Sequence, residues 1–174
     1  MNGEAQSLLL FTREMGLGLP EEVQKRIGRN PSRKSGAEHK VFFDAHIDRE
    51  RVIKVTFPGK YGRWEHTPFL YMERWQLLEE MVPEIKVRME GCIETVNGEL
   101  SIITSMQFFE GQSPTGEEAD AFVKSLGFEM LHDGTTTLDY IKRSEKLILR
   151  DCHPGNWIKT KGALVPIDII PERS

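Results

Sequence analysis

The sequence predicts an α+β fold with an antiparallel sheet, and two observations support this prediction. Asn97-Gly98, the strongest two-residue signal for a β-hairpin, separates two runs of β-rich residues, 92–96 and 100–104. Segments with helical spacing occur between such runs along the chain, so we expect helices and antiparallel strands to share one architecture.

Helices are expected in five segments of the chain. The first ends near Gly16, and the second begins at Pro20, because proline is tolerated in the first turn of a helix. Apolar side chains at helical spacing predict the third. Thr115 and Glu118 form the capping-box pattern that opens the fourth, and Gly127 is suited to end it. The expected segments are 6–14, 20 onward, 68–81, 115–126 and 138–146.

Strands are expected where β-branched and aromatic residues lie between turn signals. Besides the hairpin at Asn97-Gly98, a last hairpin is expected around Lys161-Gly162. The basic stretch from Lys25 to Lys34 contains helix-breaking residues, so we interpret it as a solvated linker. The expected strands are 40–44, 51–56, 92–96, 100–104, 157–159 and 163–165.

Composition limits the class of protein. The 174 residues suffice for one domain or two small lobes, and 39% hydrophobic with 29% charged residues is ordinary for a soluble globular chain. No apolar run approaches the ~18 residues that cross a bilayer, and the first residues lack a signal-peptide pattern, so no membrane association is expected. A net charge of -4 argues against a broad nucleic-acid-binding face. Two cysteines suit a reducing cytoplasm, which is the expected location.

Three polar residues near the end of the sequence form a candidate site. Asn156 precedes the hairpin at Lys161-Gly162 and Asp168 follows it, so we expect their side chains to lie close together. Both offer the oxygen atoms that Mg²⁺ prefers. Asp151 lies just upstream, where a carboxylate could position a hydroxyl group and accept its proton. The alternative is turn chemistry alone, with Asp151 and Asn156 capping a tight turn and Asp168 ending a strand.

A lysine within an apolar strand suggests a second part of the site. Lys54 interrupts a β-rich run, and a lysine that faces inward needs a charged partner. Glu73, on the following helix, is the expected partner and would aim the ammonium group at phosphates. The alternative is a lysine that faces outward from an alternating strand. Gly36, before the first strand, is a weak phosphate-loop signal, because such loops need several exposed backbone N–H groups.

Cys152 and His153 suggest two other kinds of site. A zinc site would need more cysteines or paired histidines than the sequence contains. A cysteine nucleophile with His153 as its base is disfavoured, because adjacent residues rarely face each other productively. We therefore interpret His153 as a residue that braces its loop by hydrogen bonding. The three tryptophans are interpreted as packing residues, without the basic residues that accompany nucleic-acid stacking.

Four motifs, taken together, resemble the protein-kinase-like fold. Their combination is most similar to the small kinase-like domains of bacterial and phage polyvalent proteins, over roughly residues 7–172. The motifs are Ser-Gly-Ala-Glu-His at 35–39, Lys-Val-Thr-x-Pro-Gly-Lys-x-Gly at 54–62, Tyr-x-Glu-Arg at 71–74 and Asp-x-His-Pro-Gly-Asn at 151–156.

The resemblance implies a minimal kinase-like fold with an antiparallel-sheet N-lobe and a reduced C-lobe that lacks the large helical substrate lobe. Residues 1–34 would be a helical extension and basic linker. Residues 35–111 would form the N-lobe-like sheet and helix, and 112–174 the truncated C-lobe with the catalytic-loop hairpin.

The resemblance also implies roles for the candidate residues with ATP and Mg²⁺ as cofactors. Asp151 would be the catalytic base, and Asn156 and Asp168 would bind the metal. Lys54 would hold the α- and β-phosphates. The remaining roles concern the nucleotide: Glu73 would brace the lysine, Gly36 would belong to the phosphate loop, and Met106 would begin the hinge beside adenine.

The sequence departs from the kinase pattern in several places. Leu149 occupies the position of the usual His, Ile169-Ile170 replaces Phe-Gly after the metal aspartate, and the loop before the first strand has one glycine instead of three. The leading hypothesis is a kinase-like ATP·Mg-binding protein that transfers the γ-phosphoryl group to an unknown protein or small-molecule hydroxyl. The alternatives are an inactive pseudokinase that senses nucleotide or binds a partner, and a remnant that binds no nucleotide. A homodimer is also considered, since the missing lobe would leave apolar surface uncovered.

Overall fold

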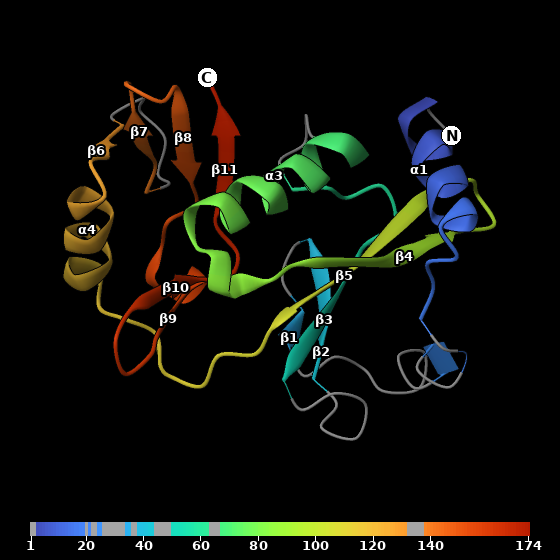
Figure 1. Cartoon of the computed structure of the whole chain (residues 1–174), viewed down its shortest axis with the longest axis horizontal. Coiled ribbons are helices and arrows are strands. Elements are labelled where there is room, and N and C mark those ends of the chain that lie inside the picture. Colours follow the sequence, from blue (N-terminus) through green and yellow to red (C-terminus); the bar gives the residue numbers. More distant parts are fainter. Residues whose placement is uncertain are drawn as a thin grey trace. The chain divides into compact units, whose positions relative to one another are not determined.

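The computed structural model describes residues 3–19, 21, 24–25, 34–35, 38–43, 50–62, 67–131 and 138–174. It is an α+β protein, in which the described residues form three α-helices and antiparallel sheets, as expected (Figure 1). The chain divides into two compact units, Met1–Glu73 with Lys86–Phe108 and Arg74–Ile85 with Phe109–Ser174. Pro20 and Gly36 lie outside the described residues, as does most of the predicted basic linker.

The elements follow one another along the chain in a mixed order. The helices are α1 (Gly3–Glu14), α3 (Pro68–Met81) and α4 (Gly116–Ser125), with 3₁₀ turns η1 (Pro83–Ile85) and η2 (Pro154–Asn156). The strands are β1 (Lys34–Ser35), β2 (His39–Phe42), β3 (Arg51–Thr56), β4 (Arg88–Glu94), β5 (Leu100–Gln107), β6 (Glu129–Met130), β7 (Tyr140–Lys142), β8 (Leu147–Arg150), β9 (Trp157–Lys159), β10 (Leu164–Pro166) and β11 (Ile170–Arg173).

The first unit is built on a five-stranded antiparallel sheet in the order β1-β2-β3-β5-β4. Its β4–β5 hairpin turns at Asn97-Gly98, where Gly98 has the positive φ of 74° that the turn requires. Helix α1 lies against β4 (Figure 1) and buries Leu8 and Leu9. At Gly91, beside the bulge in β4, the Gly18 backbone lies 3.3 Å from the place of a Cβ atom, so a side chain there would crowd it.

Polar side chains inside the first unit connect its helix to its sheet. The Tyr71 hydroxyl, fully buried on α3, lies 2.9 Å from His39 Nε2 and 3.3 Å from Thr104 Oγ1. Because buried polar groups must be hydrogen-bonded, these contacts fix which face of α3 meets β2 and β5. Both Tyr71 and His39 belong to the sequence motifs of the family resemblance, so the motifs coincide with a packing contact.

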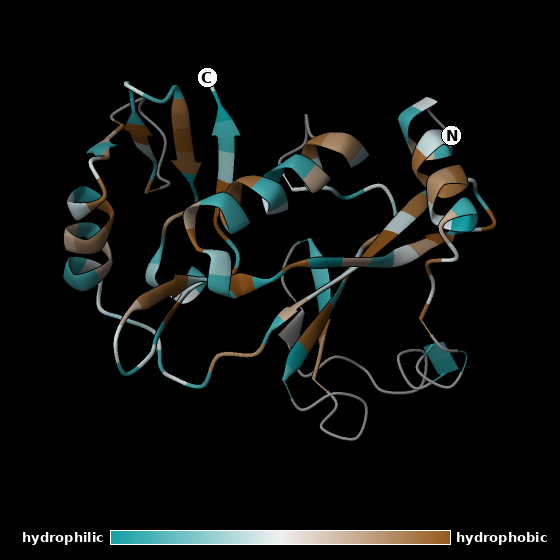
Figure 2. Ribbon diagram, viewed as in Figure 1, coloured by the Kyte–Doolittle hydropathy of each residue, from teal (hydrophilic) through white to brown (hydrophobic). Residues whose placement is uncertain are grey.

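The second unit contains a four-stranded antiparallel sheet in the order β11-β8-β7-β6 and the separate β9–β10 hairpin. Strand β8 is apolar up to Arg150 (Figure 2), and its Leu147 and Leu149 are buried. The predicted hairpin around Lys161-Gly162 is confirmed, with Val165 opposite Ile158.

The predicted helix over 138–146 is wrong. The segment forms β7 and a turn into β8, and Lys146 in that turn has a left-handed φ of 51°. The segment forms a strand and not a helix because it pairs with β8, where Tyr140 lies opposite Leu149 and both side chains are buried. Strand β11, which pairs with β8, was not expected from the sequence either.

Helix α4 begins as the sequence predicts. The Thr115 hydroxyl accepts a hydrogen bond from the Glu118 N–H (3.2 Å), and the Glu118 carboxylate accepts one from the Thr115 N–H (2.9 Å). The helix buries Val123, and Phe122 packs edge-on against Trp157 of β9 with ring centroids 5.8 Å apart. The helix therefore covers the hairpin that leads into the candidate site.

None of the helices within the described residues has both the length and the apolar character that crossing a membrane requires.

We expect Thr115→Ala to destabilise the protein by about 1 kcal/mol, since the helix loses its cap. Urea denaturation followed by circular dichroism measures the change. Thr115→Ser, which retains the capping hydroxyl, is the matched control and should remain close to wild type. Equal destabilisation by both substitutions would contradict the capping role.

Candidate functional site

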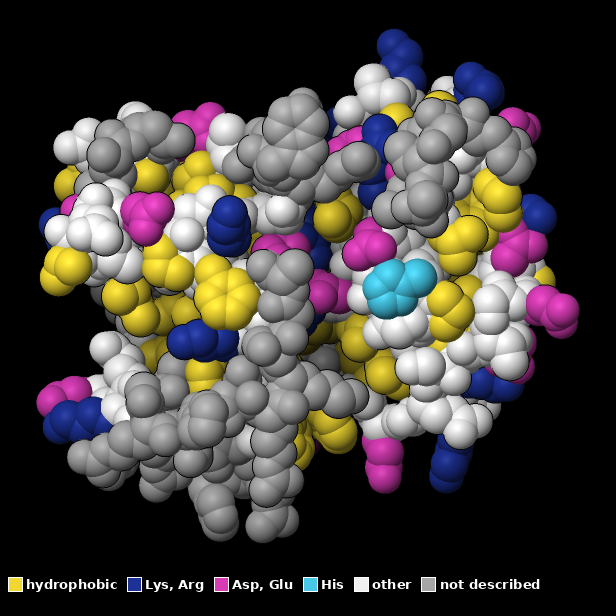
Figure 3. All heavy atoms as spheres, turned by 180° about the vertical axis from the view of Figure 1, so that it is seen from behind, with side chains coloured by type: hydrophobic (Ala, Val, Ile, Leu, Met, Phe, Trp, Pro, Cys, Tyr) yellow, Lys and Arg dark blue, Asp and Glu magenta, His cyan; other side chains and the backbone are white. Residues whose placement is uncertain are grey.

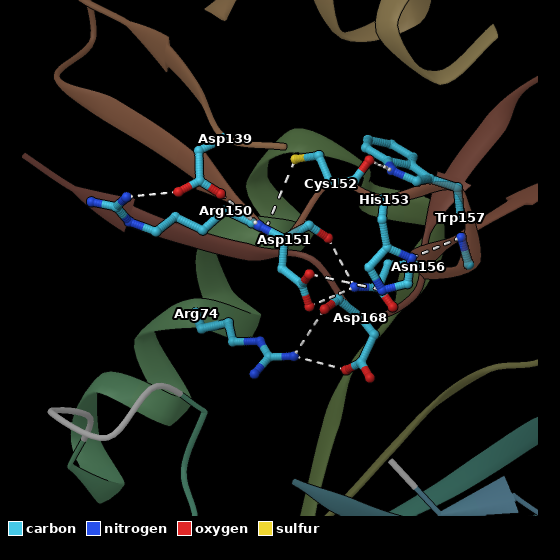
Figure 4. A network of polar contacts seen from close by, with 10 residues as sticks. Arg74, Asp139, Arg150, Asp151, Cys152, His153, Asn156, Trp157 and Asp168 are labelled. Carbon is cyan, nitrogen blue, oxygen red and sulfur yellow. Dashed lines mark hydrogen bonds and ion pairs between the residues drawn. The ribbon is translucent and has the colours of Figure 1, made fainter. Parts of the chain in front are cut away.

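The β9–β10 hairpin places Asn156 and Asp168 at its open end (Figure 4). Trp157 pairs with Pro166 in the hairpin register, and the Ile167 N–H donates to the Asn156 carbonyl at 2.8 Å. This backbone bond brings the residue before Asp168 directly beside Asn156. Both candidate metal ligands thus lie within one local structure of the second unit.

Asn156 is also tied to Asp151. Its side-chain Nδ2 donates to the Asp151 carbonyl (2.8 Å) and to Asp151 Oδ2 (2.9 Å). The amide of Asn156 is mostly buried, whereas 43% of the Asp151 side chain is exposed. Asp151 has a left-handed φ of 58°, an uncommon conformation for a residue with a side chain. The two hydrogen bonds stabilise this conformation.

Asp168 has a cationic partner within the same unit. Arg74 Nη2 donates to Asp168 Oδ1 (2.8 Å) and, more weakly, to its carbonyl (3.4 Å). The guanidinium group is 1% exposed and stacks on Trp75, with Cζ 4.8 Å from the ring centroid. A third of the Asp168 side chain remains exposed, although Arg74 holds its carboxylate.

The loop between Asp151 and Asn156 is supported by further hydrogen bonds. The Cys152 N–H donates to the Leu138 carbonyl (2.9 Å), and Trp157 Nε1 donates to the Cys152 carbonyl (3.2 Å). His153 accepts the Gly155 N–H at Nδ1 (3.0 Å) and so caps η2. His153 therefore braces its loop, as expected.

Two residues of the site were missed by the sequence analysis. Arg74 belongs to the Tyr-x-Glu-Arg motif, and that motif was the available signal for it. Asp139, a fully buried carboxylate, accepts the Asp151 N–H at 3.0 Å and Arg150 Nη1 at 2.8 Å. Nothing in its sequence context distinguishes Asp139 from an ordinary loop aspartate.

The residues predicted to contact the nucleotide belong to the first unit, in which Glu73 is the last residue of the segment Met1–Glu73. Lys54 on β3 is only 5% exposed, which excludes the outward-facing alternative. Glu73 is exposed on α3, and Met106 is buried on β5 opposite Val52. The pairing of Lys54 with Glu73 and the place of Met106 beside adenine stay predictions, and Gly36 lies outside the described residues.

A family model described as a serine/threonine/tyrosine kinase found in polyvalent proteins matches residues 2–172, nearly the whole chain. The chain belongs to this kinase family. No curated protein and no solved structure gives a significant match to it. Membership confirms the resemblance read from the four motifs and indicates a kinase-like function, and kinases in general use ATP and a divalent metal.

The side chains of this kinase-family site fit a hard cation. Because Asn156 uses its N–H groups on Asp151, its Oδ1 is the amide atom that remains for a ligand. Asp168 engages Arg74 through Oδ1, and a third of its carboxylate-bearing side chain is exposed. Amide and carboxylate oxygens are the donors that Mg²⁺ binds. Within the described part of the chain, His, Cys, Asp and Glu side chains form no cluster of three that could hold a metal.

The structure argues against a cysteine nucleophile. Cys152 is 1% exposed, and burial, together with the negative charges of Asp139 and Asp151, raises the pKa of its thiol. Burial likewise raises the pKa of the Cys92 thiol to about 12. A raised pKa reduces the thiolate fraction, and the thiolate is the reactive form.

We therefore expect neither cysteine to react with iodoacetamide at pH 8 in the folded protein, and both to react in guanidinium chloride. Mass spectrometry of the alkylated protein measures the outcome. Labelling of native Cys152 at the rate of a free thiol would show that its thiolate is accessible and would restore the nucleophile hypothesis.

Proposed function

We propose that this kinase-family chain binds ATP with Mg²⁺ and transfers the γ-phosphoryl group to a hydroxyl acceptor. The observation that supports the proposal most is the double hydrogen bond from Asn156 to Asp151. It couples an exposed carboxylate, suited to the acceptor, to an amide oxygen suited to the metal. If Asp151 and Asn156 only capped a turn and Asp168 only ended a strand, neither the exposed carboxylate nor the remaining amide oxygen would be needed.

Asp151 would act on the acceptor. Its carboxylate is the most exposed of the three candidate side chains, and it is held by Asn156 through Oδ2. His153 Nε2 lies 3.8 Å from Asp151 Oδ1, beside the carboxylate. A positioned carboxylate can orient a hydroxyl group and take its proton as the phosphoryl group transfers.

Asn156 and Asp168 would hold the metal through their oxygens. Bound Mg²⁺ neutralises phosphate charge and orients the γ-phosphoryl group. The buried Arg74 guanidinium orients Asp168 before any ligand arrives, because it donates a hydrogen bond to Asp168 Oδ1 at 2.8 Å.

Lys54 would contact the α- and β-phosphates, with Glu73 as its brace and Met106 near the adenine. The burial of Lys54 on β3 supports this assignment, since the role requires a lysine that faces inward from the strand. Gly36 is retained in the proposed phosphate loop on the family resemblance alone.

One contact favours a second candidate function, that of a catalytically inactive pseudokinase that senses nucleotide or binds a partner. Arg74 already compensates the charge of Asp168 at 2.8 Å. A metal ion at the same carboxylate would be repelled by the guanidinium group. If that repulsion prevails, the chain would bind nucleotide weakly or without metal, and it would not transfer phosphate.

A homodimer remains a proposal for the quaternary structure. Apolar side chains are exposed among charged ones (Figure 3). The exposed apolar residues include Phe11 on α1 and Met15 just after this helix. The acceptor, whether protein or small molecule, is proposed only as a hydroxyl compound, and a cytoplasmic location is likewise a proposal.

Binding of ATP and Mg²⁺ should raise the melting temperature. At a free concentration about 100 times Kd the stabilisation is about 2.7 kcal/mol, or roughly 5–10 °C for a chain of this size. Thermal shift with ATP, with and without Mg²⁺, measures it. Asp168→Asn should abolish the Mg²⁺-dependent part, whereas Asp120→Asn, on α4, should not. The absence of any shift at millimolar ATP would contradict nucleotide binding.

Turnover should depend on Asp151. We expect Asp151→Ala and Asp151→Asn both to lose about 10²–10⁴-fold in ATP turnover, because each removes the proton acceptor. Both should retain the thermal shift with ATP and Mg²⁺. Asp151→Asn preserves an acceptor for the Asn156 N–H. If this variant kept full ATP turnover, Asp151 would act through the hydrogen bond and not as a base. A wild-type chain that binds ATP without turnover would favour the inactive candidate.

A further inference from the structure

Asp139 is a fully buried carboxylate whose two oxygens bind two consecutive residues of the second unit (Figure 4). Its Oδ1 accepts the Asp151 N–H at 3.0 Å, and its Oδ2 accepts Arg150 Nη1 at 2.8 Å. The Leu131 N–H donates to the Asp139 carbonyl at 2.8 Å, which anchors its backbone. The carboxylate is thus fixed both in its main chain and in its side chain.

The contact with Asp151 acts on a strained residue. A positive φ at a residue with a side chain costs on the order of 1–3 kcal/mol and persists only where the surroundings impose it. Three hydrogen bonds hold Asp151 in this conformation. Asp139 accepts the N–H of Asp151, Asn156 donates to its carbonyl, and Leu138 accepts the N–H of the next residue.

The charge of Asp139 is balanced by Arg150. Burial opposes the charged form of Arg150, but its hydrogen bonds to Glu172 and Asp139 outweigh that effect and raise the pKa of the guanidinium group. Arg150 therefore contacts two carboxylates, one buried and one on the edge strand β11. The buried carboxylate, that of Asp139, also accepts the backbone N–H of Asp151.

We propose that Asp139 is a positioning residue that holds Asp151 in the conformation required for its action on the acceptor hydroxyl. This inference rests on the proposed function of Asp151. Asp139 does not touch the reacting groups. It acts through one hydrogen bond to the Asp151 backbone and one ion pair to Arg150.

Two substitutions separate these contacts. Asp139→Asn retains the shape of the side chain but replaces one acceptor oxygen by an NH₂ group, which must face either the Asp151 N–H or the Arg150 guanidinium. Glu172→Gln weakens the second partner of Arg150 and leaves the Asp139–Asp151 hydrogen bond in place. Both should lower the melting temperature, because both remove a charged partner of a largely buried arginine.

The kinetic test compares ATP turnover of the two variants. We expect Asp139→Asn to lower kcat about 10²-fold, the typical loss from misplacing a catalytic group by about 1 Å. Its KM for ATP should change little, since the loss concerns the transition state and not binding. Glu172→Gln should retain kcat within about threefold. Equal loss of kcat in both variants would assign the effect to Arg150 and overturn the proposal, as would full activity of Asp139→Asn.

A second readout does not depend on activity. The Asp151 amide should exchange slowly with deuterium in the wild type and in Glu172→Gln, and at least about tenfold faster in Asp139→Asn, when followed by NMR. Fast exchange of this amide in the wild type would overturn the proposal, even where Asp139→Asn fails to fold. Slow exchange together with absent ATP turnover would leave the positioning contact intact and refute the proposed function of Asp151.

Discussion

The side-chain amide of Asn156 has two N–H groups and one oxygen, and the hydrogen bonds to Asp151 use the N–H groups. This constraint determines the chemistry of the candidate site. It fixes the Asp151 backbone from the carbonyl side, orients the carboxylate, and leaves the amide oxygen for a cation. The proposed base for the acceptor and the proposed ligand for the metal are therefore linked by a single side chain. Any movement of the η2 turn would disturb both.

The charges around this amide set the second constraint. Asp151 and Asp168 bring two carboxylates into one small region. Arg150 is the neighbour of Asp151 in the sequence, and Arg74 is the ion-pair partner of Asp168. Arg150, next to Asp151, is bound by Asp139 and Glu172, whereas Arg74 contacts Asp168 directly. Arg74 orients Asp168, but its charge also competes with that of a metal ion. The balance between orientation and repulsion decides between the active kinase and the inactive candidate.

Local features of the structure were predictable from the sequence. The Asn-Gly turn, the capping box at Thr115 and the hairpin around Lys161-Gly162 each depend on residues within a few positions of one another. The motif order predicted the family, and the hairpin predicted that Asn156 and Asp168 would be neighbours.

Contacts between distant segments were not predictable. Arg74 binds a carboxylate 94 positions away, and no local pattern indicates such a pair. The segment 138–146 was assigned to a helix because its strand partners, β6 and β8, could not be identified from a single sequence. The same error concealed Asp139, whose role depends on the pairing of β7 with β8 that brings it beside Asp151.

In the proposed function, Asn156 and Asp168 bind the metal that accompanies ATP. Manganese, a paramagnetic substitute for magnesium, broadens the NMR signals of nearby nuclei. On addition of ATP with substoichiometric Mn²⁺, broadening in the second unit should concentrate at the backbone amides of Asp151–Asn156 and Ile167–Asp168. Broadening centred instead on the charged residues Glu80 and Glu145, which line a separate pocket with Leu77 and Phe128, would contradict the claim, as would no broadening at all.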